Sequence, residues 1–198
     1  MRFVDRIGRI EYTSLKGIER KRKSTLEDEE TRNGGGKKHP MRYFAYGSCM
    51  NRNDFARTCP TARLLSERAE LRGYRLVFNG RSMARGGGVA NIQRAQGHVV
   101  HGVLWDVQDP REVAALNRRE GAPYVYRRRR ARVYVEDRPV WAWTYELVNP
   151  LCVEVPPSGE YAGLILAAIA DPGYRQNVKA HICSLWKGTR NKRKGDGG

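Results

Sequence analysis

The chain is poor in cysteine, with four in 198 residues. They stand at Cys49, Cys59, Cys152 and Cys183, and they form no CxxC pair and no cysteine–histidine cluster with the spacing of a zinc site. Scattered cysteines are typical of the reducing cytoplasm, where disulfides are rare. The sequence therefore predicts a cytoplasmic protein with no metal site.

Long apolar runs are also missing. The longest, YAGLILAAIA at 161–170, has ten residues, whereas a helix that crosses a bilayer needs about 20. The first residues, MRFVDRIGRIEY, lack the continuous apolar stretch of a secretory signal. We therefore expect no membrane segment and no targeting signal.

Acidic residues are too few to balance the basic ones, since 21 Asp and Glu face 37 Lys and Arg and leave a net charge of +16. Half of this excess lies in the two ends, 1–40 and 187–198, where hydrophobic periodicity is almost absent. Such segments bury too little apolar surface to offset chain entropy. We expect 1–40 to be a basic, disordered extension and 187–198 a basic, disordered tail. One domain remains at 41–186, and Met41 is itself a candidate start of the protein.

Hydrophobic patterning within 41–186 predicts strands first and helices late. Asp109 with Pro110 begins a helix that ends before Gly121, and Ser158 caps a second helix through Ala170. A third helix begins at Asp171–Pro172. The strands are expected at 42–46, 72–80, 85–92, 98–107, 124–136 and 140–147. This order predicts an α+β fold, a small mixed, mostly antiparallel β-barrel with flanking helices.

Two basic or glycine-rich stretches resemble ligand motifs but have simpler explanations. Gly86-Gly87-Gly88 lacks the lysine and the following helix of a phosphate-binding loop, so a close backbone approach is favoured. The run Arg127–Arg130 lies on a strand, where alternate side chains point to opposite faces. A solvated face is the favoured interpretation of this run. Anion binding and nucleic-acid contact stay open.

The stretch YFAYGSCMN at 43–51 ends a strand in a small loop that carries a thiol. It is an ordinary turn, a cysteine nucleophile with His98 or His101 as its base, or a cradle of main-chain amides for a substrate. Glu120 is a candidate general acid/base, because a helix end raises the pKa of a carboxyl group there. Most glutamates at helix ends are merely solvated.

Five stretches of the sequence favour one of these interpretations, because together they resemble a known family. YFAYGSCMN, GGGVANI, HGVLWDV, LNRREGAPYVYRR and PPSGEYAGLILAAI resemble the γ-glutamylcyclotransferase family in order and spacing, across about 41–186. The resemblance implies a small β-barrel with flanking helices and a cavity at one end. It also implies that a γ-glutamyl amide is cleaved by its own α-amine, giving 5-oxoproline and a free amine or amino acid, with no cofactor and no metal.

The resemblance also implies roles for individual residues. Glu120 would be the general acid/base, and Tyr126 matches a tyrosine near the site, although Tyr124 stands close by. Ser158 and Tyr161 match the late motif and would line the cavity. The γ-glutamyl unit would be held by the main-chain amides of the turn, at Tyr46, Gly47, Ser48, Cys49 and Met50.

One departure from the family bears on the thiol. Other members often carry Asn-Leu where this chain has Cys49-Met50. Binding by main-chain amides tolerates that change, whereas binding by side chains would not. The thiol therefore has no required role in this interpretation.

Two other functions stay open at this point. A cysteine amidohydrolase would release glutamate and depend on Cys49. A binding module would keep the fold without catalysis, and its basic ends would engage RNA or another polyanion. The sequence does not separate a monomer from a homodimer, and it does not identify the amine of the substrate.

Overall fold

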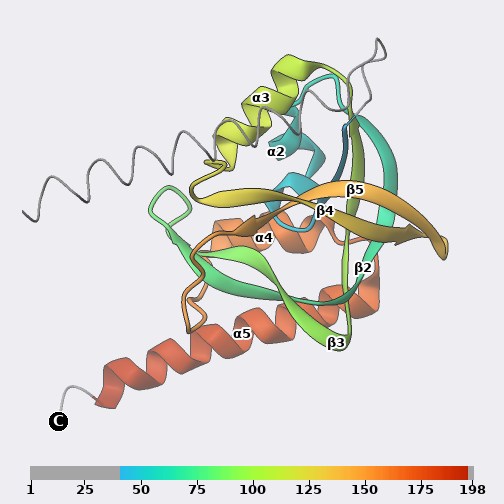
Figure 1. The fold of residues 1–198 in the computed structure, drawn as a ribbon. Helices are drawn as coiled ribbons and strands as arrows, with labels where there is room; N and C mark the ends of the chain where they lie inside the picture. Colours follow the sequence, from blue (N-terminus) through green and yellow to red (C-terminus); the bar gives the residue numbers. More distant parts are fainter. Residues whose placement is uncertain (1–40, 196–198) are drawn as a thin grey trace, which may run out of the picture. The chain divides into compact units, whose positions relative to one another are not determined.

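The computed structural model describes residues 41–195, with side chains to residue 189 (Figure 1). The expected extension at 1–40 lies outside the described residues. None of the helices in the described part is long and apolar enough to cross a membrane. The elements, in chain order, are β1 (Met41–Ala45), η1 (Ser48–Met50), α2 (Arg52–Ala56), β2 (Arg63–Ser82), β3 (Gly87–Val107), α3 (Pro110–Arg119), β4 (Tyr126–Val135), β5 (Arg138–Leu147), α4 (Gly159–Ala168) and α5 (Pro172–Gly195).

The strands form a closed barrel in the order β1-β3-β2-β4-β5. All neighbouring strands are antiparallel except β1 and β5, which are parallel. The predicted fold class, a mixed and mostly antiparallel barrel with flanking helices, is confirmed. The barrel has five strands rather than about six, because the stretches expected at 85–92 and 98–107 are one strand, β3. The exposed polar residues between these stretches hide its continuity in the sequence.

The barrel closes where β1 meets β5, and side-chain hydrogen bonds supplement the main-chain pairing at this seam. The strand register gives it a single pair, Tyr43 with Trp143. Two side-chain hydroxyls add hydrogen bonds across it. Thr144 Oγ1 donates to the carbonyl of Phe44 at 2.9 Å, and Tyr46 Oη donates to the carbonyl of Tyr145 at 2.6 Å. Side chains therefore share the closure of the barrel with the main-chain ladder.

The long last helix, α5, packs an apolar stripe against the core. Val178 and Ile182 are buried, and three further residues of the stripe pack partly buried against the same core. Figure 1 shows α5, in red, running along the barrel beside β2 and β3. The helix continues to Gly195. The segment expected to be a disordered tail, 187–198, is therefore drawn as helix as far as residue 195.

Two turns have special backbone geometry, the β4–β5 turn and the glycine loop that includes Gly88. The β4–β5 turn is made by Glu136 and Asp137, which both have positive φ, so β4 ends one residue before the bound expected at 136. The glycine loop confirms the expected close approach. Gly88 N donates to Pro156 O at 2.9 Å, and a Cβ atom on Gly88 would lie 1.9 Å from Val155 O.

Candidate active site

A small cavity of about 40 Å³ lies where the ends of several elements meet. The end of β1 and η1 form one side of it, and β3, the residue after α3, the start of β4, β5 and α4 contribute the others. Tyrosines dominate its wall. The lining residues are Tyr43, Tyr46, Gly47, Ser48, Cys49, Ala90, Glu120, Tyr126, Tyr145 and Tyr161.

The turn after β1 contributes Gly47, Ser48 and Cys49 to the wall of this cavity. Gly47 precedes the single turn η1, in which Met50 N donates to Gly47 O and Asn51 N donates to Ser48 O, both at 3.0 Å. The first amides of a helical turn have no partner inside it. The N–H groups of Ser48 and Cys49 accordingly donate to no acceptor among the described residues. A Cβ atom on Gly47 would lie 3.3 Å from the Tyr161 hydroxyl, so glycine lets the turn pack closely against α4.

Glu120 lines the same cavity and follows directly after α3. Its own N–H completes the helix by donating to Leu116 O at 3.0 Å, and Gly121, with a φ of 61°, turns the chain away. The Cys49 thiol donates to Oε1 of Glu120 at 3.5 Å. Burial raises the pKa of Glu120, while the charge of Arg119 and the thiol hydrogen bond act against this rise. The predicted direction of the shift is confirmed, but its main cause is burial rather than the helix end.

A partly buried ion cluster that the sequence analysis missed connects the turn to α3. Arg119 donates to Asp54 Oδ2 at 2.5 Å and to Ser48 Oγ at 3.3 Å, and Arg85 donates to the same two atoms at 3.2 and 3.3 Å. Burial pushes the pKa of Asp54 up, but the hydrogen bond and charge of Arg119 outweigh it and hold that pKa below its usual range. The cluster therefore fixes Ser48 and the residue next to Glu120 in one network.

The tyrosine wall is held by main-chain groups. Tyr126 Oη donates to Ala90 O at 2.9 Å, and Ala90 N donates to Tyr161 Oη at 3.2 Å. Burial raises the pKa of both tyrosines, so their hydroxyls stay protonated. The choice between two neighbouring tyrosines is resolved, because Tyr124 is 80% exposed and Tyr126 lines the cavity. Tyr145, which the sequence analysis did not single out, donates to Asn117 Oδ1 at 2.6 Å.

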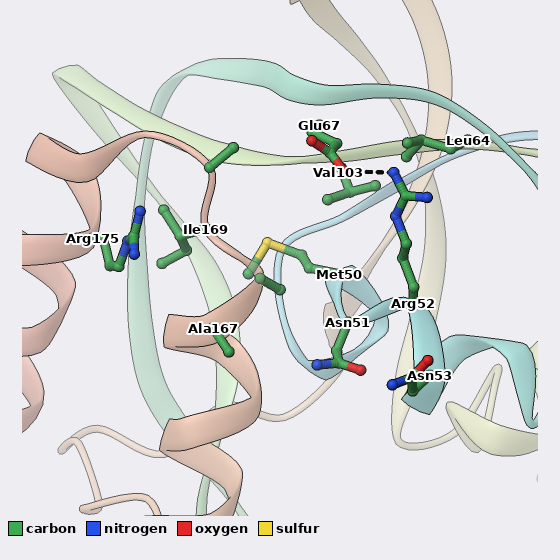
Figure 2. A pocket seen from close by; sticks show the side chains of 12 residues that line it. Met50, Asn51, Arg52, Asn53, Leu64, Glu67, Val103, Ala167, Ile169 and Arg175 are labelled. Atoms are coloured by element: carbon green, nitrogen blue, oxygen red, sulfur yellow. Dashed lines mark hydrogen bonds and ion pairs between the residues drawn. The ribbon is translucent and has the colours of Figure 1, made fainter.

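Two of the expected cavity residues lie elsewhere. Ser158 does not line the cavity, because its Oγ accepts from Tyr161 N at 3.2 Å and caps α4. Through this bond it contacts Tyr161, which does line the cavity. Met50 also lies outside the cavity. Its side chain lines a separate hollow of about 420 Å³, together with Ile169 and residues of α2 and α5. Figure 2 shows Met50 pointing into this second hollow beside Ile169 and Ala167.

The geometry does not support Cys49 as a nucleophile. Burial, and then the negative charge of Glu120, raise the pKa of the thiol far above neutrality, so the reactive thiolate is not populated. The two histidines considered as bases, His98 and His101, line a different hollow, and His101 stacks against Tyr174 at 4.6 Å between ring centroids. The described residues also hold no group of three or more His, Cys, Asp or Glu side chains placed to bind a metal ion.

Comparison with known proteins identifies the family. The family model described as "Gamma-glutamyl cyclotransferase, AIG2-like" matches residues 43–163, more than half of the chain. The chain belongs to this family. The resemblance seen in the sequence is therefore confirmed, whereas no match was found among curated proteins.

Three solved structures illustrate what this chain is similar to. One named "Gamma-glutamyl cyclotransferase" shares 25% identity at a TM-score of 0.66, over 71% of this chain and 87% of that one. An uncharacterised protein from Homo sapiens shares 26% at a TM-score of 0.66, over 72% and 88%. YkqA from Bacillus subtilis shares 26% at a TM-score of 0.65, over 75% of this chain and 56% of YkqA.

Proposed function

We propose that the protein cleaves γ-glutamyl amides or dipeptides by intramolecular cyclisation and releases 5-oxoproline with a free amine or amino acid. Membership of the family supports this reaction class. The observation that carries the proposal is the pairing of one partly buried carboxyl group, Glu120, with the free amides of Ser48 and Cys49 around one cavity. No cofactor or metal takes part in the proposed reaction.

Glu120 acts as the general acid/base in this proposal. The substrate's α-amine attacks as a neutral NH2 group, and Glu120 accepts the proton that this nitrogen loses as the new C–N bond forms. Burial raises its pKa, which makes it a better base and lets it serve later as an acid. The same proton then passes to the leaving nitrogen, so Glu120 returns to its starting state.

The main-chain amides of the turn stabilise the charge that forms on the substrate. The α-amine nitrogen attacks the γ-carbonyl carbon, and the carbonyl oxygen becomes an oxyanion. Donors fixed before the reaction stabilise such charge without reorganising. The N–H groups of Ser48 and Cys49 fill this role, and η1 and the Asp54 cluster hold them in place. The C–N bond to the leaving amine then breaks as the carbonyl reforms.

The reaction needs no covalent enzyme intermediate. The attacking nitrogen and the carbonyl carbon belong to one molecule, and closure of a five-membered ring has a high effective molarity. The tyrosine wall, with Tyr46, Tyr126 and Tyr161, encloses the γ-glutamyl unit in this proposal. The Cys49 thiol donates to the Glu120 carboxyl and attacks nothing.

The test is release of 5-oxoproline from a panel of γ-glutamyl dipeptides and γ-glutamyl amines. Replacing Glu120→Gln is expected to lower kcat by at least about 100-fold, since acid–base catalysis contributes roughly 10²–10⁴-fold. The matched control is Glu160→Gln on the exposed start of α4, which should leave the rate unchanged. Undiminished release by the Glu120 variant would remove the acid/base assignment, and glutamate as the product would indicate hydrolysis instead.

A further inference from the structure

A second surface, away from the cavity, carries chemistry that the proposed reaction does not use. It is a hollow of about 530 Å³ formed by β2, β3, β4 and β5, and it shares no lining residue with the cavity of Glu120. Its lining contains five arginines, three aromatic residues and no acidic residue. We call its charged and aromatic members the arginine–aromatic surface, and they are Arg72, Tyr74, Arg94, Arg129, Arg130, Arg132, Tyr134 and Trp141.

Guanidinium groups and aromatic rings alternate on this surface. Tyr74 has two arginines at 5.5 Å from its ring centre, Arg94 and Arg129. Arg72 lies 4.1 Å from the centre of the Tyr134 ring, and Trp141 has Arg130 at 5.2 Å. The array continues along β4 and β5, where Arg128 and Trp143 are 4.5 Å apart.

Much of the positive charge on this surface is not neutralised by the protein. Arg72 pairs with Glu70 and Asp137, and Arg129 pairs with Glu146. The other three, Arg94, Arg130 and Arg132, form no ion pair with any described residue, and all three are exposed. A surface of this kind favours an anionic partner.

The aromatic residues narrow the class of that partner. Trp141 is 54% exposed on the outer face of β5, although a large apolar ring is normally covered. Nucleobases stack on aromatic rings and on guanidinium planes, and single-stranded nucleic acid exposes bases for this purpose. Acidic peptides and lipid headgroups match the charge but leave the rings without a partner.

The spacing of the arginines fits an extended strand of phosphates. Arg130 and Arg132 point to the same face of β4, and alternate residues of a strand are about 6.7 Å apart. Successive phosphates of an extended single strand follow one another at a similar interval. We propose that the arginine–aromatic surface binds single-stranded nucleic acid, with the unpaired arginines on phosphates and Trp141 stacked on a base.

The test measures the binding of the full chain to a fluorescein-labelled single-stranded RNA of about 20 nucleotides. Fluorescence anisotropy gives the affinity at each of a range of salt concentrations. Three variants alter the proposed surface: the triple change R94Q/R130Q/R132Q, the single change R130Q and the single change W141A. The control is R57Q/R63Q/R118Q, which removes the same charge from three exposed arginines without a described ion pair. Circular dichroism at the assay temperature checks that each variant is folded.

The proposal makes a distinct expectation for each variant. Each lost phosphate contact reduces the salt slope by about 0.7 for a single strand, so R94Q/R130Q/R132Q should reduce it by about 2 and R130Q by about 0.7. W141A should weaken binding about 10-fold and leave the slope unchanged. A duplex of the same length should bind more weakly than the single strand. Release of 5-oxoproline should persist in W141A, and RNA binding should persist in Glu120→Gln.

Several outcomes would overturn the proposal. Equal losses in the two triple variants would show that net charge, including the charge of the chain ends, controls binding. If W141A binds the RNA with wild-type affinity, the proposed stacking of a base on Trp141 is excluded. Equally tight binding of polyglutamate, or of vesicles that contain phosphatidylserine, would point to a general anion surface. A wild-type chain that does not bind the RNA at about 100 mM salt ends the proposal, and R130Q alone decides the arginine contribution if the triple variant does not fold.

Discussion

Asp54 makes a sharp prediction, because one carboxylate holds two arginines beside the proposed site. Its side chain is 9% exposed, and that of Arg119 is 18% exposed. The substitution Asp54→Asn keeps the shape of the side chain and an oxygen that can accept a hydrogen bond, but it removes the charge. Arg119 also keeps its bonds to the Asp54 carbonyl and to Thr58 Oγ1. The change therefore isolates the electrostatic contribution.

The expected cost follows from the burial of the pair. An exposed ion pair contributes about 0–1 kcal/mol, whereas breaking a fully buried one costs about 3–5 kcal/mol. Asp54 and Arg119 lie between these limits and nearer the buried one, so we expect a loss of about 2 kcal/mol in the free energy of unfolding. For a chain of this length that loss corresponds to a drop in Tm of about 4–8 °C.

Chemical and thermal unfolding of the wild type and the variant measure this loss, and Glu67→Gln serves as the control. It breaks the Arg52–Glu67 pair, seen in Figure 2, whose side chains are 63% and 53% exposed. That change should cost less than about 0.5 kcal/mol. Equal costs for the two substitutions would refute the claim that the Asp54 cluster is a buried, stabilising network.

The pH dependence of the Asp54 effect has a defined sign. The folded protein holds the pKa of Asp54 below its unfolded value of about 3.9. The stabilisation is therefore complete above that value and is lost as the pH falls through the folded pKa. The difference between wild type and Asp54→Asn should be full at pH 7 and vanish in strong acid. The variant should also move the acidic limb of 5-oxoproline release to lower pH, because the negative charge of Asp54 raises the pKa of Glu120.

Three further predictions concern the thiols and the glycines. Cys49→Ala should retain 5-oxoproline release and shift the acidic limb of the pH–rate profile upward, because the thiol hydrogen bond lowers the pKa of Glu120 and its removal lets that pKa rise. Loss of activity in that variant would restore the nucleophile hypothesis. Iodoacetamide at pH 7.5 should label the exposed Cys152 well before Cys49, as followed by mass spectrometry. Gly88→Ala should destabilise the fold by about 1–3 kcal/mol, since its Cβ would meet a main-chain carbonyl, whereas Gly163→Ala, with open space around it, should be neutral or stabilising in thermal unfolding.

The parts of the fold that local chemistry determines could be predicted from the sequence. Asp109 accepts from Arg111 N, and Gly121 takes positive φ, so the bounds of α3 follow from its two ends. The tight approach at Gly88 likewise follows from a run of residues without side chains. The continuation of α5 to Gly195 could not be seen, because a helix end without an apolar stripe leaves no periodic signal.

The candidate site was only partly predictable, because its geometry depends on contacts between distant segments. Asp54 and Arg119 are 65 residues apart, and no local pattern joins them. The direction of Met50 depends on η1. Side chains in a turn with three residues per turn point about 120° apart, so Cys49 and Met50 cannot face the same cavity. The resemblance to the family identifies Glu120 and the glycine turn as candidate site residues. It does not determine where each neighbouring side chain points.

The seam between β1 and β5 depends in part on two side-chain hydrogen bonds, which single substitutions can remove. Its hydroxyl bonds lie on Thr144 and Tyr46, and Tyr46 also stands at the entrance to the turn that carries the free amides. Replacing either hydroxyl would let the two strands separate locally while the rest of the ladder stays closed. Deuterium uptake at β1 and η1 should then rise ahead of unfolding, so the geometry of the proposed site would be lost at a lower temperature than the fold itself.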